Sequence, residues 1–194
     1  MKIILASKSP RRKELLELIN IKYEAIESNS DEVYNNNLDF YHQIQEIGYN
    51  KALNVFNRTD GDRIVIGSDT VVIFNNKVLG KPKTKEDAKN MLRELSGNTH
   101  EVVTSICACV YKDNQTFEEK DYSITKVTFD NLTDDEIDYY VNKYPVCDWA
   151  GAYAIQGEFS KHIKSFNGDY FTIVGLPLNK TYNLIKKYEE FWNY

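Results

Sequence analysis

The sequence predicts an α/β protein with a mixed β-sheet flanked by helices. Two observations predict this class: strand-like apolar runs and helical patterns mix along the whole chain, and no internal repeat, low-complexity segment or linker divides it. The chain has 194 residues, of which 42% are hydrophobic and 27% are charged. This length and composition are typical of one globular domain or of two small lobes.

The N-terminal half opens with a strand and a helix. Residues 2–6 form an apolar run typical of a buried strand, and residues 10–19 have apolar side chains at helical spacing. Ser9 is a favourable N-cap and Pro10 suits the first helical position. The further elements expected here are a strand at 21–27, a polar loop at 28–37, a helix at 39–56, strand segments within 63–74, a turn at Asn75-Asn76 and a helix at 83–98.

The C-terminal half contains more strand-like runs and two more helices. Thr133 and Glu136 form a capping box that opens a helix ending before Pro145. The other elements expected are strands at 99–111, 122–129, 151–157, 159–166 and 170–174, and a final helix at 178–192.

The bulk composition argues against several classes of protein. The net charge is −5, whereas a general nucleic-acid-binding protein usually has a basic excess. We expect no secretory signal, because the apolar run at residues 1–6 is too short, and no membrane span, because no apolar run reaches 18 residues. Three cysteines, Cys107, Cys109 and Cys147, without a framework spacing indicate free thiols and a cytoplasmic location.

Cations crowd the start of the first expected helix. Arg11, Arg12 and Lys13 lie in its first turn, although the N-terminus of a helix already carries a partial positive charge. A bound anion would reverse the sign of that interaction, so one hypothesis is a phosphate site made by these three side chains with Ser7 and Ser9. The alternative is that the long side chains extend into water.

Acidic side chains supply the candidate metal ligands. Asp69 lies in the triplet that separates two apolar strand runs, where an ionised carboxylate is costly unless it is paired or binds a metal. It is therefore a candidate metal ligand or general base, or else a solvent-facing residue at a strand end. Asp31 and Glu32 could supply a second carboxylate to such a site. The alternative is that they form a solvated acidic pair. Mg²⁺ suits such sparse oxygen sites completed by substrate phosphates.

Lys51, Lys81 and Gln156 complete the candidate residues. The lysines could bind phosphate or lie on the surface, and the Gln156 amide could read a base edge or satisfy a turn backbone. The sequence has neither a P-loop nor the glycine fingerprint of a dinucleotide-binding fold. Together the cations and carboxylates indicate a phosphorylated ligand and a divalent metal.

Several motifs, in a fixed order, carry a resemblance to a known family. They are LASKSPRRKELL, SDE at 30–32, GSDTVV, LGKP, DAKNMLRELSGNTHEVVT, AGAYAIQG and GDYFTIVGLPL. With these motifs over essentially its whole length, the chain resembles the Maf family of nucleoside triphosphate pyrophosphatases, also called septum formation inhibitor Maf. The resemblance implies one domain over residues 1–194, with an elongated, twisted mixed sheet shared by two lobes around a central cleft.

The resemblance also implies an activity and the residues that perform it. It implies metal-dependent hydrolysis, with Mg²⁺ or Mn²⁺, of dTTP and UTP to the monophosphate and pyrophosphate, and it suggests a homodimer. By this similarity Asp69 is the catalytic carboxylate. The remaining roles it implies are base specificity at Arg12, Thr70 and Gln156, phosphate binding at Ser7, Arg11, Arg12, Lys51 and Lys81, and metal binding at Asp69 and Glu32.

The chain departs from the family pattern at a few positions. Tyr144 stands where an acid is usual, Trp149 where a lysine is usual and Thr172 where an asparagine is usual. The stretch before Lys51 lacks an arginine that the family often has there. A nucleotide-binding regulator of cell division with little or no catalysis is the alternative function. The chain retains Asp69, Glu32, Lys51 and Lys81, which favours catalysis.

Overall fold

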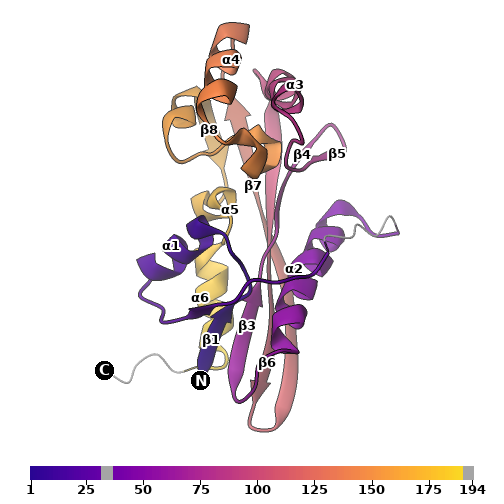
Figure 1. The fold of residues 1–194 in the computed structure, drawn as a ribbon, viewed down its shortest axis with the longest axis vertical. Coiled ribbons are helices and arrows are strands. Elements are labelled where there is room, and N and C mark those ends of the chain that lie inside the picture. Colours follow the sequence, from indigo (N-terminus) through magenta and orange to yellow (C-terminus); the bar gives the residue numbers. More distant parts are fainter. Residues whose placement is uncertain (32–36, 190–194) are drawn as a thin grey trace. The chain divides into compact units, whose positions relative to one another are not determined.

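The computed structural model describes residues 1–31 and 37–189. Within this part of the chain eight strands join one mixed sheet, in the order β2-β1-β3-β6-β4-β5, with β7 paired to β6 and to β8 (Figure 1). Strand β1 is parallel to β2 and β3, whereas β3 is antiparallel to β6. The strands are β1 (Lys2–Leu5), β2 (Glu24–Ala25), β3 (Arg63–Gly67), β4 (Thr70–Phe74), β5 (Lys77–Leu79), β6 (Thr99–Lys112), β7 (Gln115–Phe129) and β8 (Ile163–Asn167).

Helices flank this sheet, which confirms the predicted mixed α/β class. In the described residues no helix combines the length and the apolar character that crossing a bilayer requires. The α-helices are α1 (Pro10–Leu18), α2 (Phe40–Phe56), α3 (Lys85–Leu95), α4 (Asp134–Lys143), α5 (Tyr170–Val174) and α6 (Leu178–Lys186), and the 3₁₀ helices are η1 (Val146–Asp148), η2 (Ala150–Ala152) and η3 (Glu158–His162).

The chain divides into two compact units. The first contains Met1–Asp69, Thr104–Ser123 and Gly175–Tyr194, and the second contains Thr70–Val103 and Ile124–Val174. Strands β6 and β7 contribute residues to both units. A single domain over the whole chain, with two lobes around a cleft, stays a prediction.

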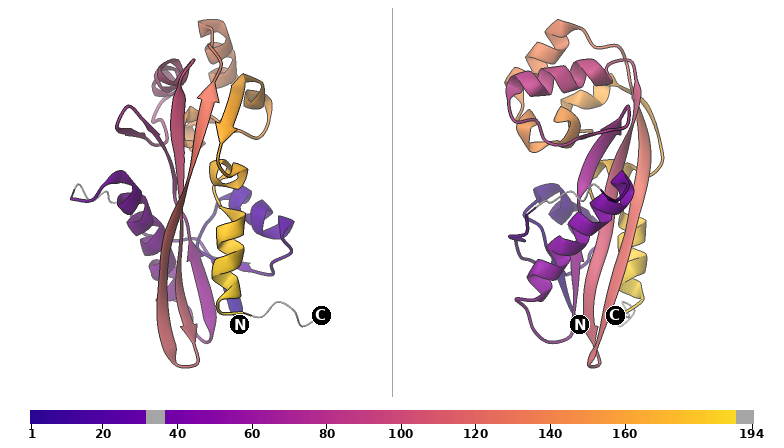
Figure 2. Two further views of the ribbon diagram at one scale, coloured as in Figure 1. Left: turned by 180° about the vertical axis from the view of Figure 1, so that it is seen from behind. Right: turned by 90° about the vertical axis from the view of Figure 1, so that its right-hand side faces the viewer.

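In the first unit, α2 and α6 cover opposite faces of the strands. Lys120 of β7 binds Glu46 of α2 at 2.9 Å, and its neighbour Asp121 binds Lys180 of α6 at 2.7 Å. Successive side chains of a strand point to opposite faces. The right-hand view of Figure 2 shows α2 and α6 on the two sides of these strands.

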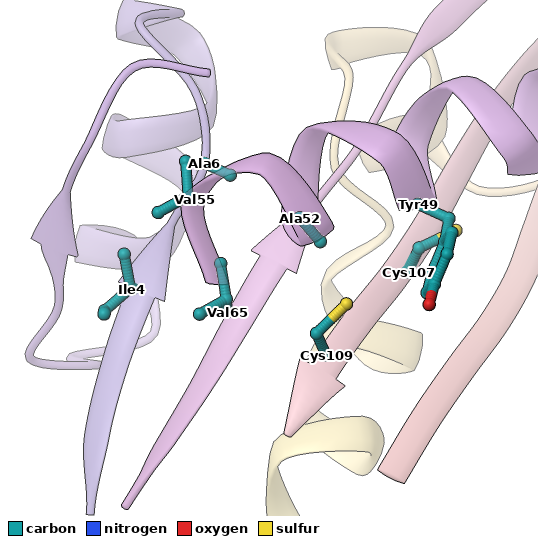
Figure 3. Packing of buried hydrophobic residues seen from close by; sticks show 8 residues of the cluster. All are labelled: Ile4, Ala6, Tyr49, Ala52, Val55, Val65, Cys107 and Cys109. Carbon is teal, nitrogen blue, oxygen red and sulfur yellow. The ribbon is translucent and has the colours of Figure 1, made fainter. Parts of the chain in front are cut away.

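The core between α2 and the sheet is apolar (Figure 3). Its members come from β1 and the residue after it, α2, β3 and β6, and they are Ile4, Ala6, Tyr49, Ala52, Val55, Val65, Cys107 and Cys109. Burial raises the pKa of Cys107 to about 12 and that of Cys109 to about 11, so both thiols stay protonated at neutral pH. Both thiols are buried, and all three cysteines are free, which confirms the prediction of free thiols.

In the second unit, α3 and α4 lie side by side and antiparallel. Polar side chains spaced four residues apart on each helix meet in three contacts, so the register of the pair is defined along its length. The contacting pairs are Lys85–Asn142, Lys89–Asp138 and Arg93–Asp134.

The strand expected at 151–157 is wrong. The structure has the 3₁₀ helix η2 followed by irregular chain, because Gly151 has φ 69° and Ala152 has φ 65°. Left-handed conformations interrupt an extended backbone. Gly157, with φ 94°, ends the segment before η3. Of the strand expected at 159–166, the part from Ile163 onward is confirmed as β8.

The strand expected at 170–174 is also wrong, because this segment is helix α5. Asp169 accepts hydrogen bonds from the Phe171 N–H and from the Thr172 hydroxyl, both at 3.1 Å. A carboxylate that binds donors of the first turn favours a helix over a strand. The final helix is shorter than expected, since α6 ends at Lys186.

Candidate functional site

The start of α1 is organised by Ser7 rather than by the N-cap residue. Ser9 occupies the predicted N-cap position and Pro10 follows it, but the Ser9 side chain makes no capping hydrogen bond. Instead the Ser7 hydroxyl accepts from the Ser9 N–H at 3.2 Å and from Arg12 Nη1 at 3.3 Å. The structure therefore brings Ser7 and Arg12 together, as a shared phosphate site requires.

A backbone carbonyl of the C-terminal segment holds Arg12 from the other side. Arg12 Nε donates to the Gly175 carbonyl at 2.8 Å, and the Ser68 hydroxyl donates to the same oxygen at 3.2 Å. Gly175 has φ 122°, a conformation that favours glycine. Because Asp69 follows Ser68 in the chain, this carbonyl links the start of α1 to the segment that carries the candidate catalytic carboxylate.

Lys51 and Asp69 form an ion pair in the first unit. Lys51 projects from α2 and Asp69 follows β3, and their Nζ and Oδ1 atoms lie 2.6 Å apart. The two side chains are only 14% and 9% exposed, so the contact is a short, charge-assisted hydrogen bond in a largely desolvated place. The sequence predicted a role for each residue but not their contact.

The other predicted residues lie elsewhere in α1, in the second unit or outside the described residues. Arg11 is half-buried in the first turn of α1. Thr70 begins β4 and is half-buried, and Lys81 is exposed after β5. Glu32, the predicted second metal ligand, lies outside the described residues.

Gln156 is exposed in the second unit, where it lines a cavity of about 740 Å³. Phe166, which is 45% exposed, and Tyr170 line the same cavity, with ring centroids 6.1 Å apart. The lining residues are Ile155, Gln156, Gly157, Ser160, Ile163, Lys164, Ser165, Phe166 and Tyr170. Amide, hydroxyl and aromatic groups in one cavity of this size suit a small planar ligand.

The candidate metal ligands among the described residues limit the kind of metal site that can form. In the part of the chain that the structure describes, no group of three or more His, Cys, Asp or Glu side chains could hold a metal ion. Asp69 is a largely buried carboxylate in the first unit, paired with Lys51. A single protein carboxylate suits Mg²⁺, which is typically bound by one or two carboxylates together with water and substrate phosphates.

Sequence reasoning missed Ser68, Ser105 and Gly175. Ser68 and Ser105 are fully buried hydroxyls, and both make contacts around Asp69. A signal existed for Ser105, because Thr104 and Ser105 are polar residues within the long apolar run of β6. Gly175 acts through a backbone carbonyl, for which the residue type gives no side-chain signal.

Comparison with known proteins identifies the family. A family model described as Maf-like protein matches residues 2–188. The chain belongs to this family. Proteins named dTTP/UTP pyrophosphatase are similar to this Maf-like chain over nearly their full length. One from Lachnoclostridium phytofermentans is 43% identical, over 96% of this chain and 94% of that protein. Another, from Clostridium perfringens, is 44% identical, over 97% of this chain and 98% of that protein.

A structural comparison finds a more distant likeness for the Maf-like chain. The crystal structure of a nucleoside-triphosphatase / dITP/XTP pyrophosphatase from Mycobacterium abscessus matches with a TM-score of 0.40 and 14% sequence identity, covering 66% of this chain and 73% of that one.

Proposed function

We propose that this Maf-like chain hydrolyses nucleoside triphosphates, dTTP and UTP above all, to the monophosphate and pyrophosphate. The names of its full-length relatives support this activity. The observation that carries the proposal is the Lys51–Asp69 pair at 2.6 Å, in the same unit as the Ser7–Arg12 contact. A largely buried carboxylate beside an ammonium group suits water attack on a polyphosphate, because it can accept a proton while the cation binds phosphate.

The cationic groups bind the triphosphate. Arg12 has its Nε engaged by Gly175 and its Nη1 at Ser7, so its guanidinium is oriented before substrate arrives. Arg11 adds positive charge, and the N–H groups of the first turn of α1 favour an anion at the same place. Lys81, in the second unit, is a further proposed phosphate-binding residue. These groups offset the charge that develops on departing pyrophosphate.

Asp69 is the general base in this proposal. Lys51 exchanges its contact with the carboxylate for a phosphate oxygen when substrate binds, and Asp69 then accepts a proton from the attacking water. The water oxygen bonds to the α-phosphorus, the bond from that phosphorus to the bridging oxygen breaks, and pyrophosphate leaves with the electron pair. Asp69, with Glu32, would hold a divalent cation, Mg²⁺ or Mn²⁺, which when bound neutralises phosphate charge and makes water more acidic.

Gln156 is proposed to select the base. Its side-chain amide offers a donor and an acceptor, which match the edge of a pyrimidine, and Phe166 and Tyr170 offer aromatic faces in the same cavity. Thr70 and Arg12 are the other proposed specificity positions. A homodimer and a cytoplasmic location stay predictions.

The test follows pyrophosphate release from a panel of triphosphates that includes dTTP, UTP, dCTP, ATP and GTP, with Mg²⁺ or Mn²⁺. Asp69→Asn should lower kcat by about 100-fold or more, because a positioned general base contributes about that much. Asp138→Asn is the matched control, since Asp138 also pairs with a lysine, Lys89, at 2.7 Å. It should keep the parent rate.

The outcomes separate the two functions considered for this family member. Survival of every triphosphate would overturn the enzymatic proposal, and tight nucleotide binding without turnover would favour a regulator. Parental turnover by Asp69→Asn would remove Asp69 from the role of base.

A further inference from the structure

Ser105 is a buried hydroxyl that the proposed reaction does not use. It lies in β6 and is fully buried, next to Ile106 and close to the apolar core of the first unit. A buried hydroxyl is costly unless it is hydrogen-bonded, so its partners indicate why a serine stands there. Its partners belong to Asp69.

Ser105 binds both backbone groups of Asp69. The Asp69 N–H donates to the Ser105 hydroxyl at 2.9 Å, and the Ser105 N–H donates to the Asp69 carbonyl at 2.9 Å. The antiparallel register of β3 with β6 pairs Gly67 with Cys107, so two residues further along it would pair Asp69 with Ser105.

The hydroxyl therefore replaces one acceptor of the sheet ladder. In a hydrogen-bonded antiparallel pair, each residue accepts through its backbone carbonyl. Here Asp69 accepts in that way, but its own N–H goes to the side chain of Ser105. This exchange of a backbone acceptor for a side-chain acceptor occurs just after β3 ends at Gly67. Ser105 thus determines how Asp69 leaves the regular ladder.

The same hydroxyl lies against the helix that carries Lys51. A Cβ atom added to Gly48 of α2 would lie 2.3 Å from the Ser105 Oγ, so only a glycine lets the helix approach this closely. Lys51 follows Gly48 by about one helical turn. Nearby, a Cβ on Gly67 would lie 2.1 Å from the Gly48 carbonyl oxygen, so α2 also lies directly on the end of β3.

We propose that Ser105 is a positioning residue for the Lys51–Asp69 pair. It binds the backbone of Asp69, it sets the depth at which α2 packs through Gly48, and it thereby fixes the distance between the ammonium and the carboxylate. The inference rests on the proposed function, because Asp69 and Lys51 are the groups that it positions. Alanine at 105 would leave the Asp69 N–H without its buried acceptor, and the carboxylate would reorient.

Ser105→Ala tests this role. It should lower kcat for pyrophosphate release from dTTP by about 10- to 100-fold, the range that a misplacement of about 1 Å can cause, while KM stays within about twofold. Ser105→Thr retains the hydroxyl acceptor and should keep the parental kcat even where its melting temperature falls.

Ser96→Ala is the matched control for lost stability. The Ser96 hydroxyl also accepts a backbone N–H, that of Leu132 at 2.7 Å, but in the second unit. Ser96→Ala should lower the melting temperature without changing kcat or KM. The positioning role is overturned if Ser105→Ala retains the parental kcat, or changes only stability as Ser96→Ala does.

The parent protein separates the failure of this inference from failure of the proposed function. If the parent releases pyrophosphate and Ser105→Ala behaves like it, the positioning role alone is wrong. A parent that is inactive on every triphosphate overturns the proposed reaction, and the positioning role falls with it.

Discussion

The first turn of α1 and the first turns of α3 and α4 are built in opposite ways. In α3, Thr84 and Asp87 cap each other's backbone N–H groups at 3.0 Å, and in α4, Thr133 and Glu136 do the same. Both helices have acidic residues in the first turn. Helix α1 has neither a side-chain cap nor an acidic first turn, and it places Arg12 there instead.

The difference contrasts two helix starts that stabilise the fold with one that we propose binds a ligand. Where side chains of the chain itself satisfy the N–H groups and the helix dipole, the start of the helix contributes stability. The start of α1 has positive charge where the dipole disfavours it, so its groups become favourable when an anion binds. Substitutions at the starts of α3 and α4 should therefore change stability, and those at the start of α1 should change activity.

The largest expected effect concerns the interior of the second unit, at His100. This side chain is 2% exposed, its Nε2 contacts the Tyr153 hydroxyl at 2.8 Å, and its Nδ1 has no hydrogen-bond partner among the described residues. Burial lowers the pKa of His100 to about 4 from the ordinary 6.5. The unfolded chain therefore takes up a proton between pH 6.5 and 4 that the folded chain does not.

The free energy of unfolding should fall as the pH drops through that window, and His100 should account for about 3 kcal/mol of the loss. Above pH 7, His100 should not change the free energy of unfolding. The measurement is the free energy of unfolding in urea at pH 7 and at pH 4 for the parent and for His100→Gln, which cannot titrate. The parent should lose about 3 kcal/mol more than the variant. Equal losses in the two proteins would show that His100 is protonated in the folded state.

Arg12→Ala should have the next largest effect, on activity. Charge-assisted hydrogen bonds contribute about 1.5–3 kcal/mol, so kcat/KM should fall by about 10- to 100-fold. Arg93→Ala is the matched control, because Arg93 is an arginine of α3 whose Nε contacts Asp134 at 2.7 Å. It should leave kcat/KM unchanged. If both variants lower kcat/KM alike, or neither does, the contrast between the two helix starts is wrong.

The sequence allowed most helices to be predicted because their signals are local. The capping box at Thr133 is visible in a few neighbouring residues, and the structure confirms it. The structure has a second capping box, at Thr84. The helix α5 could not be separated from a strand by apolar spacing over five residues. Its cap at Asp169 outweighed the pattern. The turn at Ala152 depends on a positive φ, which cannot be predicted from an alanine in the sequence.

Residue types indicated the chemistry of the candidate site but not its contacts. Lys51 and Asp69 were predicted as separate groups, since they are 18 positions apart in the chain and belong to different elements. The Gly175 carbonyl that holds Arg12 comes from a residue 163 positions away, and backbone oxygens carry no sequence signature. Such contacts depend on how the elements pack, which the periodicity of each element does not determine.

The smallest expected effect compares the two kinds of helix start directly, with Thr133→Ala and Ser9→Ala. Thr133→Ala removes a cap whose hydroxyl accepts the Glu136 N–H at 3.3 Å, and it should cost about 1 kcal/mol of unfolding free energy. Ser9 holds the equivalent position of α1 but makes no capping hydrogen bond, so Ser9→Ala should cost less than about 0.5 kcal/mol. Urea unfolding of both variants measures the difference. An equal loss would mean that the Ser9 hydroxyl caps α1 in solution, and the N–H groups of that turn would then be satisfied without an anion.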